Sequence, residues 1–216
     1  KKYYNYPVSV NDMVSLANKG GDFEVLGNED VSTSGRGKSY GIEFLYQQKL
    51  KNNFYGILSY TFFYSKFSGF DEVFLPSVWD NRNLISFTGG YKLKKNWEIS
   101  SKLRFTDKTP YAPINNKLSS QSYPEIVFDY SQLGNYYLDS FLKLDVRIDK
   151  RWNFKTTSMN FYIDIENLLL NEIPIPPEYG LERDNNQNVI LPWNLIEVES
   201  DNRNSIIPSI GFVFDF

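Results

Sequence analysis

Two carboxylates near the end of the chain have a spacing that acid–base chemistry can use. Asp164 and Glu166 are two residues apart, so on a β-strand they would share one face at a separation of about 6.5–7 Å. This separation overlaps the range found in inverting glycosidases, where two carboxyl groups flank the scissile bond. Such catalysis also needs an apolar pocket that raises the pKa of one carboxyl group. The elements that hold the pair therefore decide whether it can act as an enzyme site.

The composition removes several other kinds of chemistry. The chain has 216 residues, a net charge of -3, no cysteine and no histidine. Catalytic sites of the Ser-His-Asp, Cys-His and His-zinc types are therefore excluded, and disulfides are absent. The mildly acidic balance gives no reason to expect a nucleic-acid partner, because phosphate binding depends on clustered Lys and Arg. The sequence also predicts no cofactor and no metal site.

Hydropathy excludes spanning helices but not spanning strands. Mean hydropathy is -0.43, and no segment approaches the roughly 20 consecutive apolar residues that a spanning helix needs. Aromatic residues nevertheless make up 17% of the chain. Spanning strands hide their hydrophobicity in alternation, so their average hydropathy resembles that of a soluble protein.

Alternation of apolar and polar residues is the dominant pattern. In the last segment Ile210, Phe212 and Phe214 alternate with smaller or polar residues, and the segment ends on Phe216. The sharpest alternation lies at 142–148, where every second residue is charged. A period of two predicts strands, and the cleaner segments continue for about ten residues, the length of a tilted transmembrane strand. We expect eight strands, at 1–6, 40–47, 54–65, 85–93, 97–105, 142–148, 159–166 and 206–216.

Each predicted strand has one apolar and one polar face. The residues that we expect to face lipid are Ile42, Phe44, Ile85, Phe87, Leu144, Val146, Phe161, Ile163, Phe212 and Phe214. The charged residues that we expect to face the lumen are Glu43, Arg104, Lys143, Asp145, Arg147, Asp164 and Glu166. Most of these charges are expected to be solvated or paired with one another, and a minority to touch a substrate.

The connections alternate between two kinds. Short, basic, Asn-bearing turns are predicted at 50–53, 94–96 and 150–153, and long loops at 7–38, 66–82, 106–140 and 168–205. All the long loops fall at one end of the strands. Bacterial outer-membrane barrels have short periplasmic turns and long extracellular loops. The predicted fold class is therefore all-β, an antiparallel transmembrane β-barrel whose C-terminus is periplasmic.

Several short segments, in this order and spacing, resemble one known family: the C-terminal part of the β-barrel of a TonB-dependent outer-membrane receptor of the Bacteroidota type. The resembling segments are Gly41-Ile42-Glu43-Phe44, Phe54-Tyr55-Gly56, Ser59-Tyr60-Thr61, Trp79-Asp80-Asn81-Arg82-Asn83, Thr109-Pro110-Tyr111-Ala112-Pro113, the run from Leu144 to Lys150, Ile165-Glu166-Asn167-Leu168 and the terminal Phe216. The family often has Gly before its Pro-Tyr-Thr-Pro segment, whereas this chain has Lys108-Thr109 there and Ala112 in place of Thr.

The resemblance implies a receptor that binds a scarce nutrient and imports it across the cell outer membrane. Residues 1–216 would be a single-domain fragment, about the last eight strands of a 22-stranded barrel, with the plug domain and the signal peptide absent. The implied partners are membrane lipid, the TonB complex through the missing N-terminal plug, the barrel-insertion machinery, which would read Phe216 as its signal, and a surface lipoprotein over the loops. In a broad, water-filled lumen no apolar pocket would surround Asp164 and Glu166, so we expect no enzyme.

The loops carry two further features. The loop at 168–205 holds seven carboxylates against two arginines, a net charge of -5. That charge could favour cationic or metal-chelate ligands, but no spacing matches a calcium loop, and solubility is the simpler explanation. Loop aromatics could stack on sugars or other rings, but would more often pack the loops together. They are Trp79, Tyr111, Tyr123, Tyr130, Tyr136, Tyr137 and Trp193.

Two alternatives stay open from the sequence. One is a self-contained eight-stranded outer-membrane barrel with a structural or adhesion role, because closed barrels begin at eight strands. The other is a soluble β-sandwich binding module whose apolar faces meet in a core. The sandwich has no reason to keep all its long loops at one end.

Overall fold

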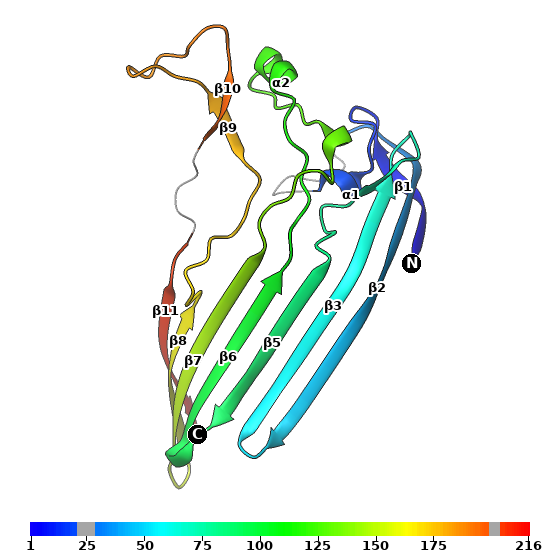
Figure 1. Cartoon of the computed structure of the whole chain (residues 1–216). Coiled ribbons are helices and arrows are strands. Elements are labelled where there is room, and N and C mark those ends of the chain that lie inside the picture. The colour runs from blue at the N-terminus through cyan, green and yellow to red at the C-terminus, as the bar shows by residue number, and fades with distance from the viewer. Residues whose placement is uncertain (21–28, 199–203) are drawn as a thin grey trace.

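The computed structural model describes residues 1–20, 29–198 and 204–216. Its main feature is one antiparallel sheet in which eight strands follow one another in chain order (Figure 1). The strands are β1 (Lys2–Ser9), β2 (Val31–Lys51), β3 (Phe54–Ser68), β5 (Asn83–Lys92), β6 (Trp97–Thr106), β7 (Phe141–Asn153), β8 (Ser158–Glu166) and β11 (Ile207–Asp215). Each of the eight predicted segments forms one of them. The sheet is open, because β1 and β11 form its two edges and do not pair with each other.

Tight turns connect the strands at the lower end in Figure 1. Between β2 and β3, Asn52 and Asn53 have φ angles of 50° and 67°. Between β5 and β6, the 3-10 turn η1 (Lys94–Asn96) has φ of 59° at both Lys95 and Asn96. Asparagine is enriched in this left-handed region because its short side chain tolerates it. The positions of these two predicted turns are confirmed.

The third predicted turn, at 150–153, is wrong by four residues. Strand β7 continues through this segment, with Lys150 opposite Phe161 and Asn153 opposite Ser158. The reversal lies at 154–157, where the Phe154 amide donates a hydrogen bond to the carbonyl of Thr157 at 2.8 Å. Adjacent basic residues such as Lys150 and Arg151 are typical of a turn, which is why the sequence predicts one here. In the structure both residues belong to β7, and their side chains lie on opposite faces of the sheet.

The predicted loop at 7–38 is also wrong in extent, because β2 begins at Val31 and has 21 residues. The segment around Gly35 and Gly37 carries little strand propensity, yet it pairs with β1 on one side and, from Arg36, with β3 on the other. Pairing on both sides overrides the weak local preference. Gly37 also leaves room for the ring of Phe67, which a Cβ there would approach to 2.3 Å.

The long connections at the opposite end contain secondary structure that the alternation did not predict. The short strand β4 (Phe74–Pro76) pairs with β3, and β9 (Glu178–Leu181) pairs with β10 (Leu195–Val198). The helices α1 (Leu16–Lys19) and α2 (Asn116–Ser122) and the 3-10 turn η2 (Tyr130–Gln132) also lie here. No helix among the described residues has the length and apolar character needed to cross a membrane.

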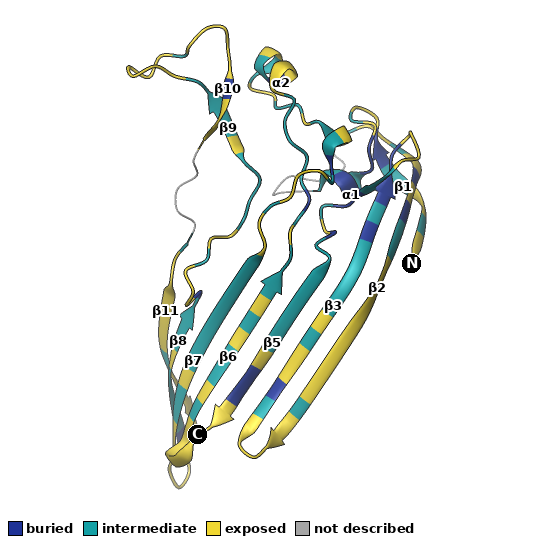
Figure 2. Ribbon diagram, viewed as in Figure 1, coloured by how far each residue is buried: buried dark blue, intermediate teal, exposed yellow. Residues whose placement is uncertain are grey.

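The sheet has almost no core of its own. The buried apolar side chains in the described part of the chain are Val8, Val14, Ala17, Phe67, Leu133 and Leu195. They lie at the loop end, as the dark segments near α1 in Figure 2 indicate. Large apolar side chains along the strands stay exposed, for example Ile42 at 75% and Phe212 at 61%. An apolar face of this size needs a cover other than this chain.

The Asn52–Asn53 turn gives a test of the hairpin geometry. We expect Asn53→Val to lower the free energy of unfolding by about 1–3 kcal/mol, because a β-branched residue tolerates positive φ poorly. Asn53→Gly is the matched control and should lose almost nothing, since glycine adopts this conformation freely. Urea unfolding in detergent micelles, followed by circular dichroism, measures both. Equal losses in the two variants would contradict the turn geometry.

Candidate functional site

The strand register collects the predicted charged residues on one face of the sheet. Arg104 lies opposite Lys143, Arg147 lies opposite Asp164, and Asp145 and Glu166 occupy the same face of β7 and β8. Glu43, on β2, lies on the same face but several strands away from the charged residues of β6, β7 and β8. We call this the polar face. The ten apolar residues predicted to contact lipid all occupy the opposite face, here called the apolar face.

Asp145 is the centre of the first charge cluster on the polar face. It accepts contacts from Arg104 Nη2 at 3.4 Å and from Lys143 Nζ at 3.5 Å. Lys143 also donates to Glu166 Oε2 at 2.7 Å. The backbone amide of Asn167, which directly follows β8, donates a hydrogen bond to Asp145 Oδ1 at 3.0 Å. The cluster therefore links β6, β7 and the end of β8.

A second cluster lies closer to the short turns. Arg147 forms a bidentate pair with Asp149, with both N···O distances at 2.9 Å. Asn160 donates to the same carboxylate at 2.7 Å, and the Arg147 guanidinium lies 3.8 Å from the ring centroid of Tyr162. Bidentate arginine–carboxylate pairs fix geometry as well as charge. Two further carboxylates border this cluster: Asp164, opposite Arg147, and Glu98, opposite Asp149.

The polar face is electrically balanced from β5 to β11. Its cations are Lys92, Lys102, Arg104, Lys143, Arg147 and Arg151, and its anions are Glu98, Asp145, Asp149, Asp164, Glu166 and Asp215. A balanced, mostly paired surface suits a wall in contact with water. Asp164 and Glu166 both have cationic neighbours and sit on an open face, and this arrangement lacks the apolar pocket that a general acid requires.

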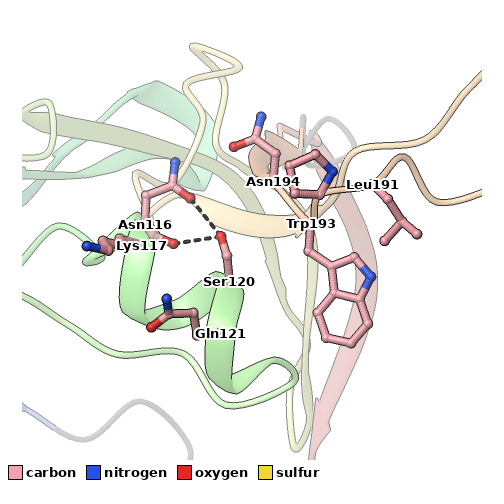
Figure 3. Close-up of a pocket in the computed structure, with 8 residues that line it drawn as sticks. Asn116, Lys117, Ser120, Gln121, Leu191, Trp193 and Asn194 are labelled. Atoms are coloured by element: carbon pink, nitrogen blue, oxygen red, sulfur yellow. Dashed lines mark hydrogen bonds between the residues drawn. The ribbon is translucent and has the colours of Figure 1, made fainter.

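The loops at the other end form two hollows. The first has a volume of about 650 Å³ and lies between α2 and the segment 191–194. Figure 3 shows the indole of Trp193 at one side of this hollow and the helix with Asn116, Ser120 and Gln121 at the other. The helix side is held by hydrogen bonds from Ser120 Oγ to the Asn116 carbonyl at 2.7 Å and from Asn116 Nδ2 to the Leu195 carbonyl at 3.4 Å. An indole with several amides suits a polar ligand that carries a ring.

The second hollow, of about 630 Å³, is lined by the segments 137–142 and 171–177. Asp139, Glu172 and Glu197 line it together with Tyr111 and Tyr137. Burial raises the pKa of the Tyr111 hydroxyl, and the charge of Glu197 raises it further. This hollow is therefore acidic. No group of three or more side chains in the described ranges is placed to hold a metal ion.

Most of the loop aromatics that the sequence singled out lie in ring pairs. Tyr111 contacts Tyr136 at a centroid distance of 6.0 Å, and Tyr123 contacts Trp193 at 6.4 Å. Tyr130 packs beside Phe128 at 6.0 Å. Two of these pairs pack within the loop at 106–140, and the Tyr123–Trp193 pair joins that loop to the loop at 168–205. Trp193 nevertheless keeps 46% of its surface exposed, and Trp79 keeps 51%.

The acidic loop at 168–205 is only partly described. Asp184 accepts hydrogen bonds from the amides of Asn186 and Asn188, each at 2.8 Å. The bonds from Asn188, with a smaller contribution from Asn186, lower the pKa of the Asp184 carboxyl. Glu199, Asp201 and Arg203 lie outside the described residues. Asp184, one of the seven predicted carboxylates, is therefore a hydrogen-bond acceptor within a local turn.

Two anchors of the loops were missed by the sequence analysis. Lys19 contacts Asp12 Oδ2 at 2.6 Å and donates to Glu29. Burial lowers the pKa of the Lys19 ammonium, but the two hydrogen bonds outweigh it and the pKa is raised. Asp80, only 1% exposed, accepts the Ser65 amide at 2.9 Å and lies 3.2 Å from Arg82. These contacts lie within or beside the loops, where the residues follow no helical or strand period, so no periodic pattern marks them.

Comparison with known proteins shows a structural similarity but no sequence match. No family model matches the chain, and no curated protein matches it. The solved structure of the outer membrane transporter YddB from Escherichia coli is similar over 99% of this chain, with 12% sequence identity and a TM-score of 0.48. The chain spans 28% of the length of that transporter's chain.

The Asp145 cluster can be tested through Lys143. We expect Lys143→Gln to lower the free energy of unfolding by about 1 kcal/mol, because a charged hydrogen bond is lost and Asp145 is left with one cation. Lys49→Gln removes an exposed cation of β2, several strands away from Asp145, for which the described structure records no ion pair, and should change stability by less than about 0.5 kcal/mol. Urea unfolding measures both, and equal effects would show that the cluster contributes nothing specific.

Proposed function

We propose that the chain forms about the last eight strands of a 22-stranded outer-membrane barrel, in a TonB-dependent receptor of the Bacteroidota type. In this proposal the apolar face contacts lipid, the polar face lines the lumen, and the receptor binds a scarce nutrient and imports it. The short turns are periplasmic, and the long loops are extracellular. The protein is a binding and transport protein and not an enzyme.

The observation that carries the proposal is a charge-free apolar band bordered by aromatic residues. On β3, Tyr64 stacks on Tyr40 at a centroid distance of 5.1 Å, and Phe54 lies ten residues away, opposite Tyr91. Ten residues span about 33 Å along a strand, or roughly 25 Å along the membrane normal at a tilt of about 40°. This equals the height of the apolar band of outer-membrane barrels.

No charged residue faces outward inside this band in the described strands. The outward positions that carry charge lie beyond Tyr40 and Tyr64, at Lys2, Arg36, Lys38 and Lys66, or at the short-turn end, at Lys150. A soluble sheet face has no reason to exclude charge over this height, because exposed charges there are favourable. Lipid imposes the exclusion, since a charge within the hydrocarbon layer is costly.

The other features support a part of a larger barrel. Strand β11 ends beside the 154–157 turn, so Phe216, the proposed signal for the barrel-insertion machinery, lies at the short-turn end. The unpaired edges of β1 and β11 favour further strands over an eight-stranded closure. The scarcity of buried apolar residues disfavours a soluble sandwich, whose two sheets would share a core.

In the proposed receptor, the loops with their two hollows face the outside and receive the ligand, where a surface lipoprotein could cover them. The balanced polar face would contact the plug and water. The TonB complex would act through the plug, which these residues do not include. The charge pairs of β6, β7 and β8 then have the role of a stable wall rather than of a reaction centre.

Single introduced cysteines test the membrane position, because residues 1–216 contain no native cysteine. In intact cells that produce the full-length protein, a membrane-impermeant maleimide should label Leu191→Cys, in the loops. Lys95→Cys, in a short turn, should react only after the outer membrane is permeabilised. Ile42→Cys should stay unreactive in the membrane although its side chain is 75% exposed.

The same three variants carry their own control. After denaturation in detergent, all three should react at equal rates, which shows that each thiol is intact. Rapid labelling of Ile42→Cys in intact cells would contradict a lipid-facing position. Labelling of Lys95→Cys and Leu191→Cys from the same side would contradict the proposed orientation.

Energised import is tested at the level of the cell. Deletion of the gene should abolish growth on one scarce nutrient from a panel, and deletion of TonB should give the same loss. Growth that survives TonB deletion but not gene deletion would support the alternative of a passive or structural barrel.

A further inference from the structure

The short-turn end of the apolar face holds one cation between two indole rings. Lys150 Nζ lies 5.3 Å from the ring centroid of Trp97 and 5.5 Å from that of Trp152. Trp97 is directly opposite Lys150 in the β6–β7 register, and Trp152 follows on the same face of β7. The ammonium also donates a hydrogen bond to the carbonyl of Lys95. Two of its three donors therefore remain for another partner.

The surroundings of Lys150 are apolar and cationic. The rings of Trp97 and Trp152 are 41% and 37% exposed, and Phe154 in the adjacent turn is 61% exposed. Lys94, Lys95 and Lys155 are exposed in the turns on either side. The nearest carboxylates, Glu98 and Asp149, point to the polar face. Lys150 has no salt bridge within the described ranges, in contrast to Lys143 and Arg147 on the other face.

We propose that Lys150, Trp97 and Trp152 form a binding site for the headgroup phosphate of an anionic phospholipid in the leaflet at the short-turn end. This inference rests on the proposed membrane location of the apolar face. The two indoles sit where amphipathic rings meet the headgroup layer, and they hold the ammonium at the edge of the apolar band. A phospholipid fits both parts of the site, because its phosphate reaches the ammonium while its acyl chains cover the apolar strands above.

A free phosphate ion fits the site less well. It would gain the ammonium contact but nothing from Phe154 or the indole faces, and in water a single exposed lysine attracts an anion weakly. The neighbouring lysines add a diffuse attraction for an anionic leaflet, which acts over the whole surface. At Lys150, the two indole rings and the hydrogen bond to Lys95 also hold the ammonium in one position, so a bound phosphate would have a defined place. The anionic lipid should therefore be retained at this place and exchange more slowly than a bulk lipid.

The test uses the full-length receptor reconstituted in vesicles of phosphatidylcholine alone or with one third phosphatidylglycerol. Flotation reports insertion, and spin-labelled lipids of each type report how much of each is held at the protein surface. The wild type should prefer the anionic lipid. Lys150→Gln should reduce that preference about tenfold, because the variant loses a hydrogen bond between an ammonium and a phosphate in addition to the general attraction of a lysine for the leaflet.

Two matched variants separate the site from general charge. Lys150→Arg should keep the preference, and Lys155→Gln, which removes an exposed turn lysine without flanking indoles, should reduce it much less. Each variant is first checked for native folding by comparing the gel mobility of unheated and heated samples in SDS. Added inorganic phosphate at millimolar concentration should not displace the lipid.

The outcomes are distinguishable. Failure of the wild type to float with either vesicle would overturn the membrane location, and the site with it. Flotation with both vesicles but without preference for the anionic lipid would overturn the site and leave the proposed function standing. Equal losses in Lys150→Gln and Lys155→Gln, or displacement by inorganic phosphate, would also overturn the site.

Discussion

A β-strand sends successive side chains to opposite faces, and in this chain the two faces need different surroundings. From β2 to β11 one face carries Ile42, Phe87, Val146 and Phe212, and the other carries arginine, lysine, aspartate and glutamate. A shift of the register by one residue would put charges among the apolar side chains over a whole strand. The alternation therefore determines the register, and the register determines which charged residues lie close enough to pair. One face of the sheet needs apolar surroundings and the other needs water.

The strands and their faces could be predicted because they depend on residues that are neighbours in sequence. The order and approximate position of all eight segments, and the faces of the cleanly alternating ones, follow from alternation, and the Asn52–Asn53 turn follows from asparagine's tolerance of positive φ. The errors come from contacts between distant segments. The segment around Gly35 is a strand because β1 and β3 pair with it, and Lys150 extends β7 because Trp97 and Phe161 lie beside it.

The candidate site could be predicted only in part. Alternation placed Lys143, Asp145, Arg147 and Glu166 on one face. It did not predict which charges pair, because a long side chain can reach the next carboxylate on its own strand or a diagonal one on the neighbouring strand. The loop end was less predictable still. Asp80 and Lys19 contact partners from irregular loop segments or strand ends, and the hollow beside Trp193 exists because α2 meets the 191–194 segment. None of these contacts leaves a periodic signal.

The measurement that tests the central claim most directly is a spin-label scan along β3 in lipid vesicles. Nitroxides at successive positions from 54 to 64 would be compared for accessibility to oxygen, which partitions into lipid, and to a water-soluble nickel chelate. The account predicts an oscillation with a period of two, in which Leu58, Tyr60 and Phe62 favour oxygen and Ile57, Ser59 and Thr61 favour the chelate. High chelate accessibility on both faces, or an oscillation of the opposite phase, would contradict it.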